Sequence, residues 1–152
     1  MINFIFICIE NLSLNGNILH STIPYQLRNL DNLVRLNLAS NKLNGTIPEV
    51  EFKNLQFLNF DNNTLNGTIP QSIFNLDKIE SLYLQINMLS GTISSFASKY
   101  LRVLSLVDNK LTGALPDLSQ SVSLETIDLQ TNEFSGQIPD NITNLMNLKT
   151  RE

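Results

Sequence analysis

Apolar residues recur along the chain in a short fixed pattern rather than in amphipathic blocks. In the stretch LNLASNKLNGTIP, residues 36–48, Leu36 and Leu38 alternate with polar neighbours and are followed by Asn41, Leu43 and Gly45. Alternation with a period of two residues predicts a short strand with one buried face. Asparagine and glycine favour turns, so the strand should end near Asn41.

The same pattern occurs six times, over residues 12–24, 36–48, 58–70, 82–94, 104–116 and 127–139. Successive copies begin 22 to 24 residues apart, a period typical of a leucine-rich repeat solenoid, an α/β architecture in which each turn packs on its neighbours. We therefore predict one domain over residues 1–152, with strands near residues 12, 36, 58, 82, 104 and 127 in one parallel sheet. Residues 1–11 are interpreted as a partial leading repeat and residues 140–152 as a truncated last repeat.

The segment that returns from one strand to the next differs between copies. Leu27, Leu30 and Leu33 are three residues apart, a spacing that suits a 3₁₀ or short helical turn on the convex side. Residues 73, 76 and 79 repeat this spacing, as do residues 142, 145 and 148. In the two 22-residue copies the spacing is irregular, over residues 49–57 and 95–103, so the shortening is predicted to fall on this convex leg.

Two turn positions recur with the strand. A glycine follows the strand in five copies, where a tight or left-handed backbone is easiest for glycine, and Ser21 takes its place in the first copy, which predicts a looser turn there. An asparagine recurs in all six copies, and because a buried amide must be hydrogen-bonded, we predict a structural ladder that satisfies backbone groups of adjacent turns. The predicted ladder consists of Asn17, Asn41, Asn63, Asn87, Asn109 and Asn132.

The complete pattern, LxxLxxLxLxxNxLxGxIP, resembles the plant-type class of extracellular leucine-rich repeats found in receptor-like kinases, receptor-like proteins and polygalacturonase-inhibiting proteins. The resemblance covers about residues 6–148. It implies a right-handed superhelix with a concave parallel sheet, and short extra strands near the Gly-x-Ile-Pro segments. It also implies recognition of a protein or peptide ligand outside the cell or at its surface, with a co-receptor as a possible partner. The class usually has paired cysteines in its caps; with Cys8 alone, we expect no complete caps.

The opening residues, MINFIFICIE, lack the charged start and cleavage site of a signal peptide, and the apolar run is too short to cross a membrane. Phe6, Ile9 and Leu12 instead fit the three-residue step of a leading repeat. The single Cys8 cannot form an internal disulfide, and we interpret it as a small buried apolar residue. No targeting segment or transmembrane helix is therefore expected.

Composition and charge argue against several functions. The net charge of −4 is mild, and no basic stripe is present, so nucleic acid is not an expected partner. The one histidine, His20, is interpreted as a solvated turn residue, and no acid, base and nucleophile converge. We expect no catalytic residues, no metal site, no cofactor and no enzymatic activity.

Binding is the better-supported function. Stacked strands turn the positions between the leucines into three columns on the concave face, and with strands about 4.8 Å apart six of them extend about 24 Å. Aromatic and apolar side chains bordered by polar ones are typical of a partner surface. The candidate ligand-binding residues are Phe57, Asp61, Tyr83, Gln85, Val103, Val107, Asp128 and Gln130.

Two further patterns bear on function. Five Asn-x-Ser/Thr triplets are N-glycosylation acceptors if the chain is secreted, at Asn11, Asn44, Asn62, Asn66 and Asn141. A threonine column, Thr22, Thr46, Thr68 and Thr92, is either a strand preference or, remotely, an ice-binding array. The favoured hypothesis is a ligand-binding segment of a receptor-like protein. The alternatives are a polygalacturonase inhibitor-like protein and a structural or vestigial solenoid.

Overall fold

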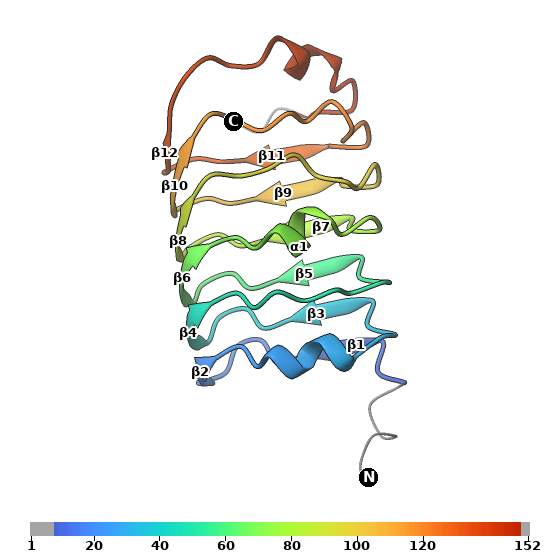
Figure 1. Cartoon of the computed structure of the whole chain (residues 1–152), viewed down its shortest axis with the longest axis vertical. Coiled ribbons are helices and arrows are strands. Elements are labelled where there is room, and N and C mark those ends of the chain that lie inside the picture. The colour runs from blue at the N-terminus through green and yellow to red at the C-terminus, as the bar shows by residue number, and fades with distance from the viewer. Residues whose placement is uncertain (1–7, 150–152) are drawn as a thin grey trace.

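The computed structural model describes residues 8–149 and is a solenoid of about six turns with two parallel sheets along its length (Figure 1). Each turn gives one strand to each sheet; the repeat pattern predicted the first sheet, and the family resemblance implied the second set of short strands. The first sheet contains β1 (Asn11–Ser13), β3 (Arg35–Asn37), β5 (Phe57–Asn59), β7 (Ser81–Tyr83), β9 (Val103–Ser105) and β11 (Thr126–Asp128). The second contains β2 (His20–Thr22), β4 (Lys42–Thr46), β6 (Thr64–Thr68), β8 (Met88–Gly91), β10 (Lys110–Gly113) and β12 (Glu133–Phe134).

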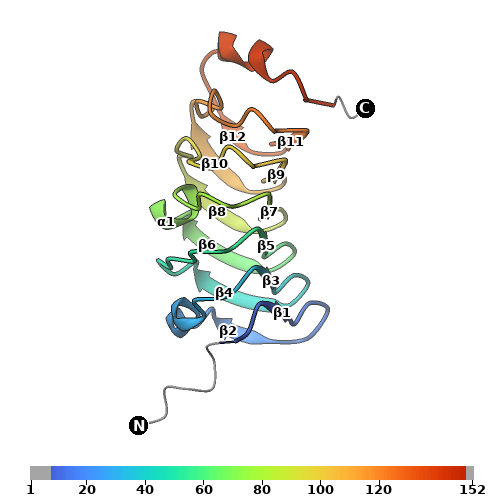
Figure 2. The same ribbon diagram turned by 90° about the vertical axis from the view of Figure 1, so that its right-hand side faces the viewer.

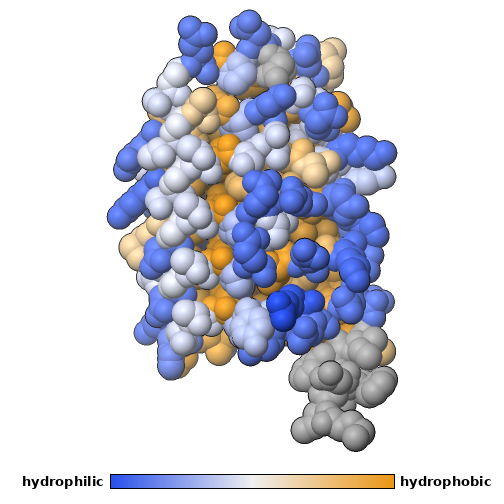
Figure 3. All heavy atoms as spheres, in the orientation of Figure 1, coloured by the Kyte–Doolittle hydropathy of each residue, from blue (hydrophilic) through white to orange (hydrophobic). Residues whose placement is uncertain are grey.

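The core is a continuous stack of leucines between the first sheet and the returning segments. Leu36, Leu58, Leu82 and Leu104 are fully buried at the centres of their strands, because alternation places them on the inner side of the sheet. Ile127 in β11 is only half-buried, since no described turn beyond it supplies a full layer. On the face drawn in Figure 3, hydrophobic residues form a narrow stripe along the stack with hydrophilic residues on both sides.

Short helices occupy only three of the returning segments. They are η1 (Tyr25–Asn29), α1 (Gln71–Phe74) and η2 (Asp140–Asn144), the three segments in which apolar residues keep the three-residue spacing. Among the described residues the two shortened legs, where the spacing is irregular, have no helix. Figure 2 shows α1 on the opposite side of the stack from the first sheet, so the helices lie on the convex side.

The second sheet begins at the repeated asparagine turn and depends on glycine. Gly45, Gly67 and Gly91 have φ of 73°, 73° and 78°, a left-handed backbone that glycine adopts without steric cost. The predicted looser turn at Ser21 is wrong, because Ser21 has a φ of 82° and follows the same path in β2. No described earlier turn supplies a threonine against it, so its side chain has room.

Two predictions at the start of the chain need comment. Cys8 is exposed rather than buried, because no described turn lies before β1 to cover it. Ile9 and Leu12 pack against the core, whereas Phe6 lies outside the described residues, so the leading repeat stays a prediction.

Candidate functional site

The concave face rests on a row of asparagine amides that join consecutive turns. Asn63, for example, donates from Nδ2 to the carbonyls of Leu38, Phe60 and Asp61 at 3.0–3.1 Å, and its Oδ1 accepts from the amide of Leu43 at 3.0 Å. Asn41, Asn87, Asn109 and Asn132 make the corresponding contacts with the preceding turn. Asn17, in the first copy, bonds only carbonyls of its own turn, those of Leu14 and Asn15. The amides therefore fix the backbone behind the strands.

Strand register places the concave residues in straight columns. The first column is Asn11, Arg35, Phe57, Ser81, Val103 and Thr126, and the central column is Ser13, Asn37, Asn59, Tyr83, Ser105 and Asp128. A third column continues through Ala39, Asp61, Gln85, Val107 and Gln130, each of which lies beside the next through backbone hydrogen bonds. A ligand on this face would therefore meet side chains from several turns at once.

An aromatic pair lies at the centre of these columns. The rings of Phe57 and Tyr83 have centroids 5.7 Å apart and are tilted by 49°. The guanidinium carbon of Arg35 lies 4.1 Å from the Phe57 centroid, within the range of a cation–π contact. Both rings are half-buried, so each keeps area available to a partner.

Asp61 and Gln85 lie beside the aromatic pair in the third column. Gln85 Nε2 donates to Asp61 Oδ2 at 2.9 Å. Partial burial raises the pKa of the Asp61 carboxyl above its ordinary value of 3.8, and a hydrogen bond with Asn59 opposes this rise. Gln85 Oε1 is enclosed and has no hydrogen-bond partner among the described residues. A buried acceptor without a donor is costly, so Gln85 Oε1 would be stabilised by a hydrogen-bond donor.

The other predicted binding residues are more separated. Val103 is in register with Ser81, which lies between it and Phe57. Val107 is on the far side of Gln85, joined through the Ile86 amide and the Val107 carbonyl at 2.8 Å. The sequence predicts that Phe57, Tyr83, Val103 and Val107 lie close together; the two rings do, whereas Ser81 separates Val103 from Phe57 along the first column.

The last two candidates, Asp128 and Gln130, lie on β11 and just after it. The Gln130 amide donates to Asp128 Oδ1 at 3.3 Å. They form a polar end of the concave face.

Sequence reasoning missed an apolar corner next to the site. Ile86, in the turn between β7 and β8, and Met88, the first residue of β8, are 48% and 41% exposed. The signal was present in the repeat pattern, because the positions equivalent to Ile86 in the neighbouring copies are the polar Asn62 and Asp108. Ile86 also has a left-handed φ of 54°, which is uncommon for a β-branched residue.

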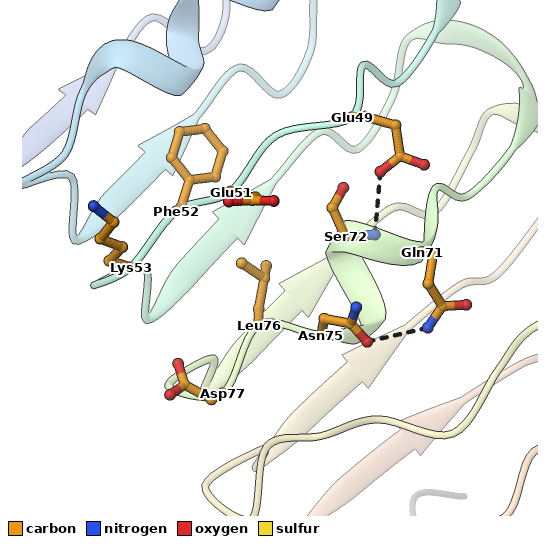
Figure 4. A pocket seen from close by; sticks show the side chains of 9 residues that line it. All are labelled: Glu49, Glu51, Phe52, Lys53, Gln71, Ser72, Asn75, Leu76 and Asp77. Atoms are coloured by element: carbon orange, nitrogen blue, oxygen red, sulfur yellow. Dashed lines mark hydrogen bonds between the residues drawn. The ribbon is translucent and has the colours of Figure 1, made fainter.

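A hollow of about 460 Å³ lies on the convex side between the shortened leg and α1 (Figure 4). Its walls carry mixed charges, including Glu49, Lys53 and Asp77, and Glu49 accepts a hydrogen bond from the Ser72 amide at 3.3 Å. Phe52 and Leu76 also line it and are largely buried. The hollow follows from the shorter leg and contains none of the predicted site residues.

The remaining candidates are dispersed. His20 is exposed in β2 rather than on a turn. Asn11, Asn44, Asn62 and Asn66 are exposed, and Asn141 lies in η2. The threonines do not lie opposite one another, because the second sheet is offset: Thr22 pairs with Asn44, and Thr46 with Asn66. This offset is unfavourable for a regular ice-binding array.

Residues 8–149 contain no group of three or more histidine, cysteine, aspartate or glutamate residues placed to hold a metal ion. No helix in that part of the chain is long and apolar enough to cross a membrane.

Comparison with known proteins places the chain in a family. A family model for the leucine-rich repeat matches residues 32–50, 54–76 and 123–145. The BIR2 ectodomain from Arabidopsis thaliana is 32% identical, with a TM-score of 0.71, and the match covers 83% of this chain and 69% of that one. The chain therefore belongs to the plant-type leucine-rich repeat family, whose solved relatives here are receptor ectodomains.

Two longer structures are also similar. The plant peptide hormone receptor RGFR1, in complex with RGF2, is 31% identical with a TM-score of 0.88, over 92% of this chain and 23% of the receptor. The Arabidopsis receptor kinase HAESA, in complex with the peptide hormone IDA and the co-receptor SERK1, is 27% identical with a TM-score of 0.69, over 94% and 29%. The chain thus spans less than a third of these receptors. A search of curated protein sequences gave no significant match, and the family and structure comparisons indicate no enzymatic family.

Proposed function

We propose that the chain is a ligand-recognition module of an extracellular receptor-like leucine-rich repeat protein, and that it binds an extended peptide or an exposed protein segment on the concave sheet. The observation that carries the proposal is the pair of rings, Phe57 and Tyr83, presented on an otherwise largely polar face. Half-buried aromatic residues are the side chains that most often dominate binding energy at protein interfaces.

The setting of these rings supports the same proposal. The asparagine amides hold the strands from behind, so the rings are positioned before a ligand arrives, and preorganisation lowers the entropic cost of binding. The complexes of RGFR1 and HAESA with peptide hormones are consistent with a peptide ligand for this chain, and the HAESA complex adds a co-receptor as a possible second partner. An extracellular location, with glycans on exposed asparagines, belongs to this proposal.

Selection of random heptapeptides displayed on phage by the immobilised chain tests the proposal. We expect Tyr83→Ala and Phe57→Ala each to weaken capture of the selected peptides by about tenfold or more, the usual loss at an aromatic anchor. Tyr100→Ala is the matched control, because Tyr100 is an exposed tyrosine on a convex leg. Melting curves verify the fold of each variant.

Three results would contradict the proposal. The first is that no peptide is selected above the blank surface. The second is that both Tyr83→Ala and Phe57→Ala capture the peptides as well as the unmodified chain, and the third is that Tyr100→Ala loses as much capture as they do.

A further inference from the structure

We propose that Asp61 and Gln85 form a subsite for a basic side chain of the ligand, a lysine or an arginine, and that Ile86 and Met88 contact an apolar residue next to it. This inference rests on the proposed function and specifies the chemistry of the ligand.

Asp61 has no counter-charge of its own. None of the ion pairs between described residues includes it, and its contact with Gln85 is a hydrogen bond from a neutral amide. Partial burial removes water from this carboxyl and raises its pKa. A cation brought by a ligand would give it charge-assisted hydrogen bonds, which are about twice as strong as neutral ones.

A cation would also give Gln85 the hydrogen-bond donor that its Oε1 lacks. Its Nε2 is engaged by Asp61 while its Oε1 is enclosed without a donor. If a cation replaces the amide at Asp61, the Gln85 side chain is free to turn and to present Oε1 to the same cation. An ammonium has three donors and a guanidinium five, so either group can bond both acceptors.

The surroundings fit a cation. Tyr83 is two residues before Gln85 on the same side of β7, and aromatic rings attract cations within about 6 Å of their centroids. The face already contains one such contact, between Arg35 and Phe57. The outward positions of β5, β7, β9 and β11 and of the third column include Asp61 and Asp128 but no lysine or arginine, so this half of the face complements a basic ligand.

The apolar corner extends the subsite in one direction. Ile86 follows Gln85 directly. Met88 is the first residue of β8 and pairs with Asn66 of β6. The equivalent positions in the adjacent copies are polar: Asn62, Thr64, Asp108 and Lys110. Exposed apolar residues at both of these positions, Ile86 and Met88, are thus specific to the fourth copy, which also contains Gln85. We call these two residues the apolar band. A ligand that places a basic side chain on Asp61 would place its neighbouring residue on this band.

The test uses the same heptapeptide selection. Peptides selected on the unmodified chain should be enriched in lysine or arginine beside an apolar residue, relative to the input library. A synthetic copy of the best peptide should bind Asp61→Asn at least about tenfold more weakly, the range for a lost hydrogen bond to a charged group. Asp77→Asn, the same charge change on an exposed convex residue, should bind it normally.

A second arm combines a change in the peptide with the same protein variant. Replacing the basic residue of the peptide by norleucine should cause the same loss on the unmodified chain and no further loss on Asp61→Asn, because the two changes remove one interaction. Selected peptides without basic enrichment, or independent losses in this cycle, would overturn the inference. Capture that depends on Tyr83 would then leave the proposed function standing, whereas a failure to select any peptide would remove both.

Discussion

On the second sheet, the side-chain methyl group of a threonine packs against the glycine of the following turn, at the place where a Cβ atom would lie. A Cβ added at Gly67 would lie 2.8 Å from Thr46 Cγ2, and Gly45, Gly91 and Gly113 have the same contact with the threonine of the preceding turn. Each glycine is therefore required both for its left-handed backbone and for the methyl group packed above it. At Gly136 the neighbour is Ala114, and the contact opens to 3.9 Å.

Gly67→Ala should destabilise the chain by about 2 kcal/mol, because a left-handed alanine costs roughly 1–2 kcal/mol and the Thr46 methyl must also move. Urea unfolding followed by circular dichroism measures the change. Gly16→Ala is the control: its φ is 69° but nothing lies within 4 Å of the added Cβ, so only the backbone term of about 1 kcal/mol applies. Equal losses at the two sites would show that the threonine contact has no energetic weight.

The pH dependence of peptide binding should report the state of Asp61. Partial burial raises the pKa of this carboxyl above 3.8, and a cation binds only the ionised form. Affinity for a basic peptide should therefore fall on acidification, with a midpoint above 3.8. Ala39, Asn59 and Gln85 neighbour Asp61, and none of the three ionises in this range.

Fluorescence polarisation of a labelled peptide, from pH 7 down to pH 4, measures this dependence. In Asp61→Asn the residual affinity should not change over the same range. An unmodified chain whose affinity is constant to pH 4 would contradict the assignment of Asp61 as the acceptor of the basic group.

Serine replaces leucine on two of the convex legs. The hydroxyl is hydrogen-bonded on one leg and has no partner among the described residues on the other. Ser98 and Ser121 occupy the position held by Leu30 and Leu76 in other copies, and both are fully buried. Ser98 Oγ donates to the Ile79 carbonyl at 2.8 Å and accepts from the Tyr100 amide at 3.1 Å. Ser121 Oγ has no partner among the described residues.

Alanine substitution should therefore change the stability of the chain in opposite directions at the two legs. Ser121→Ala removes an unsatisfied buried hydroxyl and should stabilise the chain by about 1 kcal/mol, whereas Ser98→Ala breaks two hydrogen bonds and should destabilise it by about 1–2 kcal/mol. Thermal melting of the pair is a direct comparison, because both changes remove the same atom from a buried site. Destabilisation by both would show that Ser121 is satisfied, for instance by water.

At the level of elements, prediction succeeded where a local pattern determines the structure. The convex helices occur where apolar residues keep a three-residue step, since that step is what a 3₁₀ turn needs. The offset of the second sheet was not predictable in this way. Repeat counting aligns Thr22 with Thr46, but backbone pairing aligns Thr22 with Asn44, and this register depends on how far each turn advances along the strand.

In the candidate site too, the local sequence pattern predicts some features and not others. Alternation alone was enough to assign Phe57, Tyr83 and Asp61 to columns of the concave sheet. The contact between the rings, the Arg35 stacking and the bond between Gln85 and Asp61 depend on side-chain rotamers, which the sequence does not encode locally. Ile86 lies outside the three columns, and its signal is its difference from the polar equivalents Asn62 and Asp108 in neighbouring copies.

Over the whole molecule, stability is distributed along one axis, because each turn contacts only its neighbours. The last described turn is loosely packed. Ile138 and Met146 are exposed, and an apolar gap of about 180 Å³ separates it from the preceding turn. Hydrogen bonds to the preceding turn offset this, including Asn147 to the Val122 carbonyl at 3.0 Å.

Glu125 links three turns at this end of the stack. Lys149 Nζ donates to Glu125 Oε2 and Arg102 Nε to Oε1, both at 2.7 Å. These two hydrogen bonds lower the pKa of the Glu125 carboxyl below 4.5. A carboxyl whose pKa is lowered by folding contributes stability above its unfolded pKa, and the contribution is lost as the pH falls through the lower, folded value.

Glu125→Gln should therefore loosen the last turn selectively at neutral pH, because it removes the charge that Arg102 and Lys149 share. Hydrogen exchange of residues 140–149 should become faster, while residues 57–84 keep their protection, since effects in a solenoid decay over neighbouring turns. Below the folded pKa of Glu125 the difference from the unmodified chain should vanish. Lys53→Gln is the control, because Lys53 makes only an exposed 3.8 Å pair with Asp31 and such pairs contribute little. Uniformly faster exchange along the whole chain would instead show that the solenoid unfolds as a single cooperative unit.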